Sequence, residues 1–67
     1  MTVILDERYE VTVRGPEKIG PREWTAEGAI YERGKNRVIK RVTGRGSTKT
    51  SASNDAVSEA RAEAARM

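Results

Sequence analysis

The chain has 67 residues, of which 13 are Lys or Arg and 10 are Asp or Glu, so its net charge at neutral pH is +3. It contains no Cys and no His, which excludes disulfide bonds, thiolate metal sites and the histidine that most often serves as a general base. We therefore expect one small non-enzymatic domain, residues 1–67, that needs no metal and no cofactor.

The location of the protein is predicted from what its apolar segments lack. No apolar run reaches the roughly 20 residues that a membrane-spanning helix needs. Residues 1–6 have neither the basic region nor the long apolar region of a signal peptide. We expect a cytoplasmic protein with no membrane partner.

The first half of the chain has the pattern of β-strands. Residues 2–5 are a short apolar run that favours a further edge strand. Apolar and polar side chains alternate over residues 9–14, which is typical of a half-buried strand. Gly15-Pro16 is expected to end this strand. Residues 23–32 predict the next strand, although their Ala and Glu content leaves a helix as the competing interpretation.

The second half predicts a turn, a strand, a loop and a helix. Residues 33–36 form a polar turn that leads into a strand over 37–43. The Gly, Ser and Thr content of residues 44–53 is typical of a flexible loop. From residue 54 to about 66 the apolar period changes to that of a helix. The expected fold class is α+β, a three-stranded antiparallel sheet with one C-terminal helix packed on one face.

The predicted hydrophobic core is thin. A chain of this length buries only about 60% of the surface that its unfolded form exposes, and this one contains no Phe. We place Trp24 in the core because it shares a strand face with Ala26 and Ile30. Since no disulfide or metal can reinforce such a core, we expect a homodimer, formed by residues 2–5 pairing strand edges.

The distribution of charge gives the strongest functional signal. Residues 1–32 carry four basic and seven acidic groups, and residues 50–67 carry two basic and three acidic groups. Residues 33–49 contain seven charged groups, all of them basic, so this segment has a charge of +7 while the rest of the chain is acidic. We expect this segment to bind nucleic-acid phosphates, with Tyr31 as an exposed ring that stacks on bases. The seven basic residues are Arg33, Lys35, Arg37, Lys40, Arg41, Arg45 and Lys49.

Two alternatives remain open for the basic segment. It also fits a solvated face in a protein that associates with itself or with another protein and binds no nucleic acid. Within the segment, residues 44–50 resemble a phosphate-cradling loop that ends in Lys49-Thr50, but Thr48 stands where a Walker A loop has Gly. A flexible linker into the helix is the competing interpretation of the same residues.

From Tyr9 to Ala65 the order of motifs resembles the strand–strand–strand–helix part of a double-stranded RNA-binding domain. The shared motifs are Gly20-Pro21, Trp24, Arg33-Gly34-Lys35, Gly44-Arg45-Gly46-Ser47 and the alanines from Ala60 to Ala65. The first helix of that family and the lysine cluster of its last helix have no counterpart here. The resemblance implies a non-enzymatic module that contacts a phosphate backbone. A similar order of elements occurs in DNA-binding domains of integrases, which use the sheet to contact the major groove.

Overall fold

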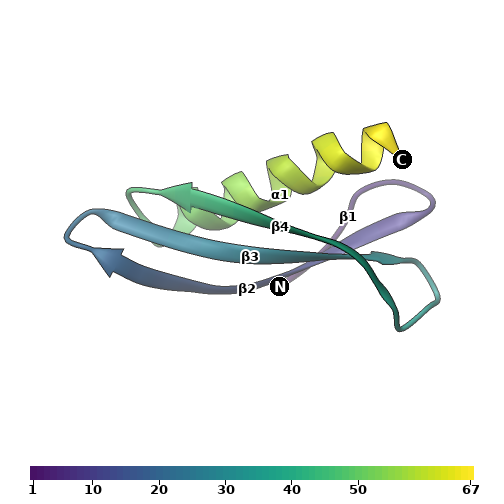
Figure 1. Ribbon diagram of the computed structural model, residues 1–67, viewed down its shortest axis with the longest axis horizontal. Coiled ribbons are helices and arrows are strands. Elements are labelled where there is room, and N and C mark those ends of the chain that lie inside the picture. The colour runs from purple at the N-terminus through teal and green to yellow at the C-terminus, as the bar shows by residue number, and fades with distance from the viewer.

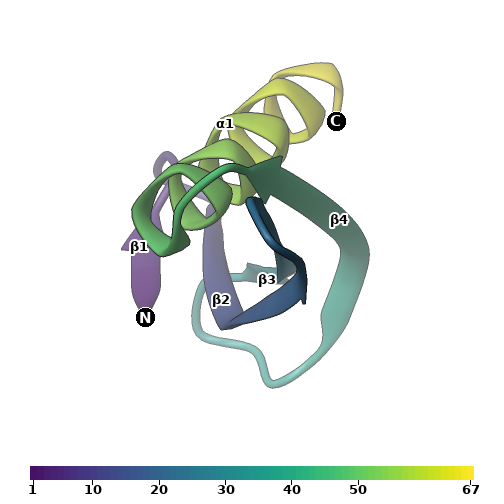
Figure 2. The ribbon, with the colours of Figure 1, turned by 90° about the vertical axis from the view of Figure 1, so that its left-hand side faces the viewer.

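The computed structural model describes residues 1–67 as one sheet with one helix on it. The four strands and the helix are β1 (Thr2–Ile4), β2 (Tyr9–Gly20), β3 (Glu23–Glu32), β4 (Val38–Gly46) and α1 (Lys49–Arg66). Neighbouring strands are antiparallel and lie in the order β1-β2-β3-β4, and α1 covers one face of the sheet (Figures 1 and 2). The predicted α+β fold, with its additional edge strand, is confirmed. No helix is long and apolar enough to cross a membrane.

Strand β2 is longer than predicted, because Gly15-Pro16 does not end it. The pairing of β2 with β3 shifts register between Arg14 and Glu17 and then continues to Gly20. Gly15 has a φ of 89°, a conformation that side chains with a Cβ rarely adopt. The two residues therefore form an irregularity inside the strand, which the hairpin absorbs without a break.

The flexible loop predicted over residues 44–53 is wrong. Gly44 and Gly46 belong to β4, and α1 begins at Lys49 rather than at residue 54. A Cβ on Gly44 would collide with the backbone of Ala56, and one on Gly46 would collide with Ser51. The two glycines are thus explained by the close approach of the helix to the strand, and not by a need for flexibility.

The early start of α1 has a local cause in a capping box. The Ser51 backbone N–H donates to Thr48 Oγ1 at 3.1 Å, and the Thr48 N–H donates to Ser51 Oγ at 3.0 Å. Asp55 lies further along α1. Its Oδ2 accepts a hydrogen bond of 2.9 Å from the Arg45 backbone N–H and so ties the helix to β4.

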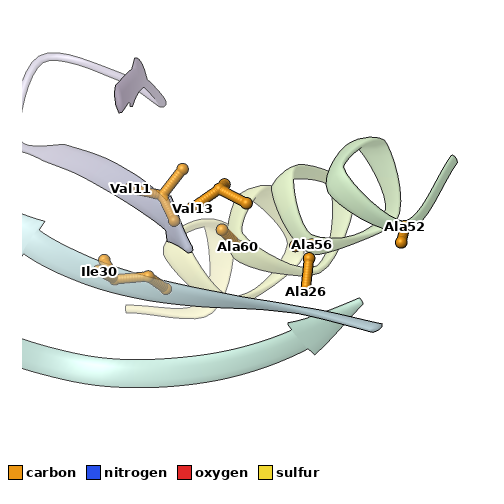
Figure 3. Packing of buried hydrophobic residues seen from close by; sticks show 7 residues of the cluster. All are labelled: Val11, Val13, Ala26, Ile30, Ala52, Ala56 and Ala60. Atoms are coloured by element: carbon orange, nitrogen blue, oxygen red, sulfur yellow. The ribbon is translucent and has the colours of Figure 1, made fainter. Parts of the chain in front are cut away.

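Small side chains form most of the core between α1 and the sheet. The helix contributes only alanines to it, spaced four residues apart. Of the sheet residues in the core, only Val11 and Ile30 are both large and fully buried (Figure 3). Trp24 is partly buried and packs against this cluster. This core is as thin as the composition predicted. Its members are Val11, Val13, Ala26, Ile30, Ala52, Ala56 and Ala60.

Candidate nucleic-acid interface

The sheet has two faces, of which α1 covers one. In β4, Val42 packs against the core and Gly44 lies under the helix, so the residues that alternate with them project from the other face. We call this uncovered side of the sheet the open face, and the cross-strand register assigns its members. They are Thr2, Ile4, Glu10, Thr12, Arg14, Glu17, Thr25, Glu27, Ala29, Tyr31, Val38, Arg41, Thr43 and Arg45.

Three of the seven predicted basic residues lie in the turn between β3 and β4. Arg33, Lys35 and Arg37 are all exposed there. Both ribbon views show this turn bending away from α1, on the side of the open face (Figures 1 and 2). Lys35 Nζ is 3.5 Å from a carboxylate oxygen of Glu32, and both side chains of this pair are about half exposed or more.

Two more basic residues lie on the open face of β4. Arg41 is the register partner of Ala29, and Arg45 is the register partner of Thr25. Both register partners are uncharged, so neither offers a carboxylate to the guanidinium group beside it. Neither Arg41 nor Arg45 forms an ion pair within the protein, and both are exposed.

Lys40 lies on the opposite face from Arg41. Its Nζ is 2.5 Å from Oε2 of Glu63 in α1, and Arg66 Nη1 is 3.2 Å from the other oxygen of the same carboxylate. The hydrogen bond from Lys40, with the charges of Lys40 and Arg66, lowers the pKa of Glu63 against a smaller opposing effect of burial. Lys40 therefore connects the sheet to the helix, and we leave it out of the candidate interface.

Lys49 is also separated from the open face. It is the first residue of α1, and its Nζ lies 5.4 Å from the ring centroid of Trp24. Lys18 Nζ lies 6.0 Å from the same centroid, so two cations lie at cation–π distance from one ring. Because Gly44 and Gly46 are in β4, only Ser47 and Thr48 connect the strand to the helix. Residues 44–50 therefore form neither of the two alternatives considered for them, a phosphate-cradling loop or a flexible linker.

The open face has two depressions. The larger, of about 390 Å³, is lined by residues from β1, β2, β3 and the β3–β4 turn. Tyr31 lines it from the open face, the side opposite Trp24 as predicted, but it is half-buried and not exposed. The lining residues are Thr2, Glu10, Thr12, Tyr31, Lys35 and Asn36. The smaller depression, of about 150 Å³, is lined by Arg14, Gly15, Glu17, Thr25 and Glu27.

Sequence reasoning did not select Arg14, which joins the basic residues of the open face. Arg14 is the register partner of Glu27 and forms no ion pair. The alternation of β2 does place Arg14 on the open face, because its side chain projects from the opposite side of the strand to the core residues Val11 and Val13. What the sequence lacked was the register that sets Arg14 on the same face as β4's arginines. No group of three or more acidic side chains comes together that could hold a metal ion.

Comparison of the chain with protein-family models, with curated proteins and with solved structures found no match. The resemblance to double-stranded RNA-binding domains thus depends on the order of the sequence motifs alone. The function has to be argued from the surface of this protein.

Proposed function

We propose that the protein is a non-enzymatic nucleic-acid-binding module that binds phosphates along β4 and the β3–β4 turn. One observation carries this proposal. The four arginines of this segment are exposed, lie beside or on the face that α1 leaves uncovered, and form no ion pair within the protein. With Lys35 they form a surface that we call the basic ridge: Arg33, Lys35, Arg37, Arg41 and Arg45.

The chemistry of the ridge favours phosphate as its ligand. A guanidinium group presents a planar fork of donors that matches phosphate oxygens, and an unpaired one gains a partner without losing another. The side of the open face formed by β2 and β3 carries Glu10, Glu17 and Glu27 against one basic residue, Arg14, so its net negative charge repels a polyanion. A nucleic-acid backbone should therefore follow β4 and the turn, and not cross the sheet toward β2.

The proposal is tested by titrating duplex DNA, duplex RNA and single strands at low and moderate ionic strength. Binding that releases counterions weakens with salt, with a log–log slope of about −0.9 for each phosphate contacted on duplex DNA. We expect sequence-independent dissociation constants on the order of 10⁻⁴ to 10⁻⁶ M. Arg41→Glu combined with Arg45→Glu should weaken binding at least tenfold and flatten the salt dependence.

The matched control changes the same number of charges on the helix. Arg61 and Arg66 are exposed on α1, away from the open face. Arg61→Glu combined with Arg66→Glu should keep most of the affinity if the ridge is the binding surface. Equal losses in both double variants would show that only net charge matters. Absence of salt-sensitive binding to any nucleic acid would overturn the proposal.

Self-association is a second candidate function, favoured by the contrast between the two edges of the sheet. Met1 and Val13 exchange backbone hydrogen bonds, so the backbone groups of Thr2 and Ile4 point outward from β1. No charged side chain lies in β1, whereas β4 carries like charges that would repel a second β4. Two β1 strands related by a two-fold axis at Val3 would satisfy these outward groups.

This second candidate is tested by sedimentation at micromolar concentration. We expect the wild type to sediment as a dimer, and Thr2→Pro to shift it to a monomer, because proline removes an outward donor without breaking the pairing of β1 with β2. A wild-type monomer whose melting temperature does not depend on concentration would eliminate self-association.

A further inference from the structure

The larger depression on the open face has a polar lining with one aromatic ring. Glu10 of β2 is the register partner of Tyr31 in β3, so the carboxylate and the ring stand side by side across two strands. Lys35 and Asn36 approach from the β3–β4 turn and complete the wall. At about 390 Å³, the depression falls in the size range of small-molecule sites, roughly 300 to 1,000 Å³.

Several polar groups of this lining have no partner within the protein. The Glu10 carboxylate, the Tyr31 hydroxyl and the Asn36 side-chain amide form no hydrogen bond and no ion pair. The hydroxyls of Thr2 and Thr12 lie 3.3 Å apart and bond only to each other. The depression therefore offers acceptors and donors that are free to bind a ligand.

The placement of charge decides which part of a nucleotide fits. Glu10 puts a carboxylate in the depression, which repels a phosphate and accepts hydrogen bonds. Lys35, at the rim, is one member of the basic ridge and attracts a phosphate. The group that enters must then be uncharged, flat enough to lie on Tyr31 and equipped with a donor. A nucleobase with an exocyclic amino group has these properties.

We propose that this depression holds one unpaired, amino-bearing nucleobase while the basic ridge holds the phosphates on either side. The base stacks on Tyr31, and its amino group donates to Glu10, in the way that acidic side chains accept from the N4 amino group of cytosine. The inference rests on the proposed function and makes it narrower. Because a paired base cannot leave its stack without cost, the protein should prefer single strands or loops over duplexes.

The test compares short fluorescent strands of oligo-dC, oligo-dT and the matching duplex at neutral pH. We expect oligo-dC to bind most tightly, because the cytosine amino group presents two N–H donors, whereas the one donor of thymine, N3–H, lies between two carbonyl oxygens that repel the Glu10 carboxylate. Tyr31→Ala should weaken single-strand binding roughly five- to hundredfold, the range measured for loss of one stacked base. Tyr31→Phe keeps the ring and is the matched control, so it should bind nearly as well as the wild type.

Glu10→Gln gives an independent measure of the same site. Removing this negative charge should strengthen binding to oligo-dT while reducing the preference for oligo-dC. A Tyr31→Ala variant that binds all strands like the wild type would overturn the base site, as would equal wild-type affinities for dC, dT and duplex. If the ridge variants still weaken binding in those cases, the proposed function stands without the base site. Circular dichroism shows whether each variant keeps its fold.

Discussion

The two faces of the sheet are built from alternate residues of the same strands, and they differ in almost every physical property. The face under α1 has an apolar, tightly packed centre, and Lys40, one of the charged residues at its margin, is paired with Glu63. The open face carries hydroxyls, carboxylates and guanidinium groups, of which Arg14, Arg41 and Arg45 have no ion partner. Along the strands of this small protein, every second residue faces the helix and maintains the fold, and the residues between them are available for binding.

The largest effect is expected from a bulky residue under the helix. Gly44→Val would force a side chain into the backbone of Ala52 and Ala56, which cannot move without displacing α1. We expect loss of the cooperative thermal transition, measured by circular dichroism at the helix band. The exposed Gly34 has open space around it; although its φ of 83° makes substitution strained, Gly34→Asn should keep the transition. If Gly44→Val unfolds with a wild-type midpoint, the close approach of α1 is wrong.

The next effect compares one side chain from each face. Ile30 is fully buried, so Ile30→Ala should reduce the free energy of unfolding by about 2 to 5 kcal/mol. Thr43 is exposed on the open face, and Thr43→Ala should change the free energy of unfolding by no more than about 0.5 kcal/mol. Urea denaturation monitored by Trp24 fluorescence measures both. Similar losses for the two variants would mean that the open face is covered in solution.

Two neighbouring residues of β4 provide a finer comparison. Lys40→Ala removes the contact with Glu63 and should lower the urea midpoint slightly while leaving nucleic-acid affinity near the wild-type value. Arg41→Ala should leave the midpoint unchanged and reduce the magnitude of the salt slope by up to about 0.9, the contribution of one phosphate contact. The reverse outcome, with Lys40 affecting binding and Arg41 affecting stability, would show that the faces are assigned wrongly.

The smallest effect is a pH dependence confined to the covered face. Lys40 lowers the pKa of Glu63 in the folded protein, with a further contribution from Arg66. A carboxylate with a lowered folded pKa stabilises the protein above its unfolded pKa, and this stabilisation is lost as the pH falls through the folded value. Glu63→Gln should therefore be less stable than the wild type at neutral pH, and the two proteins should become equally stable only at a pH below the lowered folded pKa of Glu63. Urea midpoints of both proteins at the two pH values measure this, and a constant difference would exclude the ion pair as its cause.

The strands could be predicted where apolar and polar residues alternate regularly and a turn motif follows. The alternation over residues 9–14 and 23–32 identified β2 and β3. Trp24, which was placed in the core, is only partly buried and packs against it. The region 44–53 was not predictable, because Gly and Ser are equally common in loops and under a closely packed helix. Only the position of α1 distinguishes the two, and that position is a tertiary property.

The candidate site was predictable in composition but not in arrangement. The basic segment was evident, and Tyr31 was selected as an exposed ring. The sequence could not show that Lys40 and Arg41 serve opposite faces, because that requires knowing which face α1 covers. Nor could it bring Glu10 next to Tyr31, since their register depends on the irregular pairing of β2 and β3 further along the hairpin.

The alanine stripe of α1 has a consequence for how the helix finds its position. Buried alanines recur every four residues, so a slide of four residues, about 6 Å, would put Ala56 where Ala52 packs and Ala60 where Ala56 packs. Methyl groups of equal size distinguish poorly between these two settings. The choice falls to polar contacts that occur once: Asp55 on the Arg45 backbone and Glu63 on Lys40. A few hydrogen bonds at the surface thus select the position of α1 along the sheet, because the alanine methyl groups of the core do not determine it.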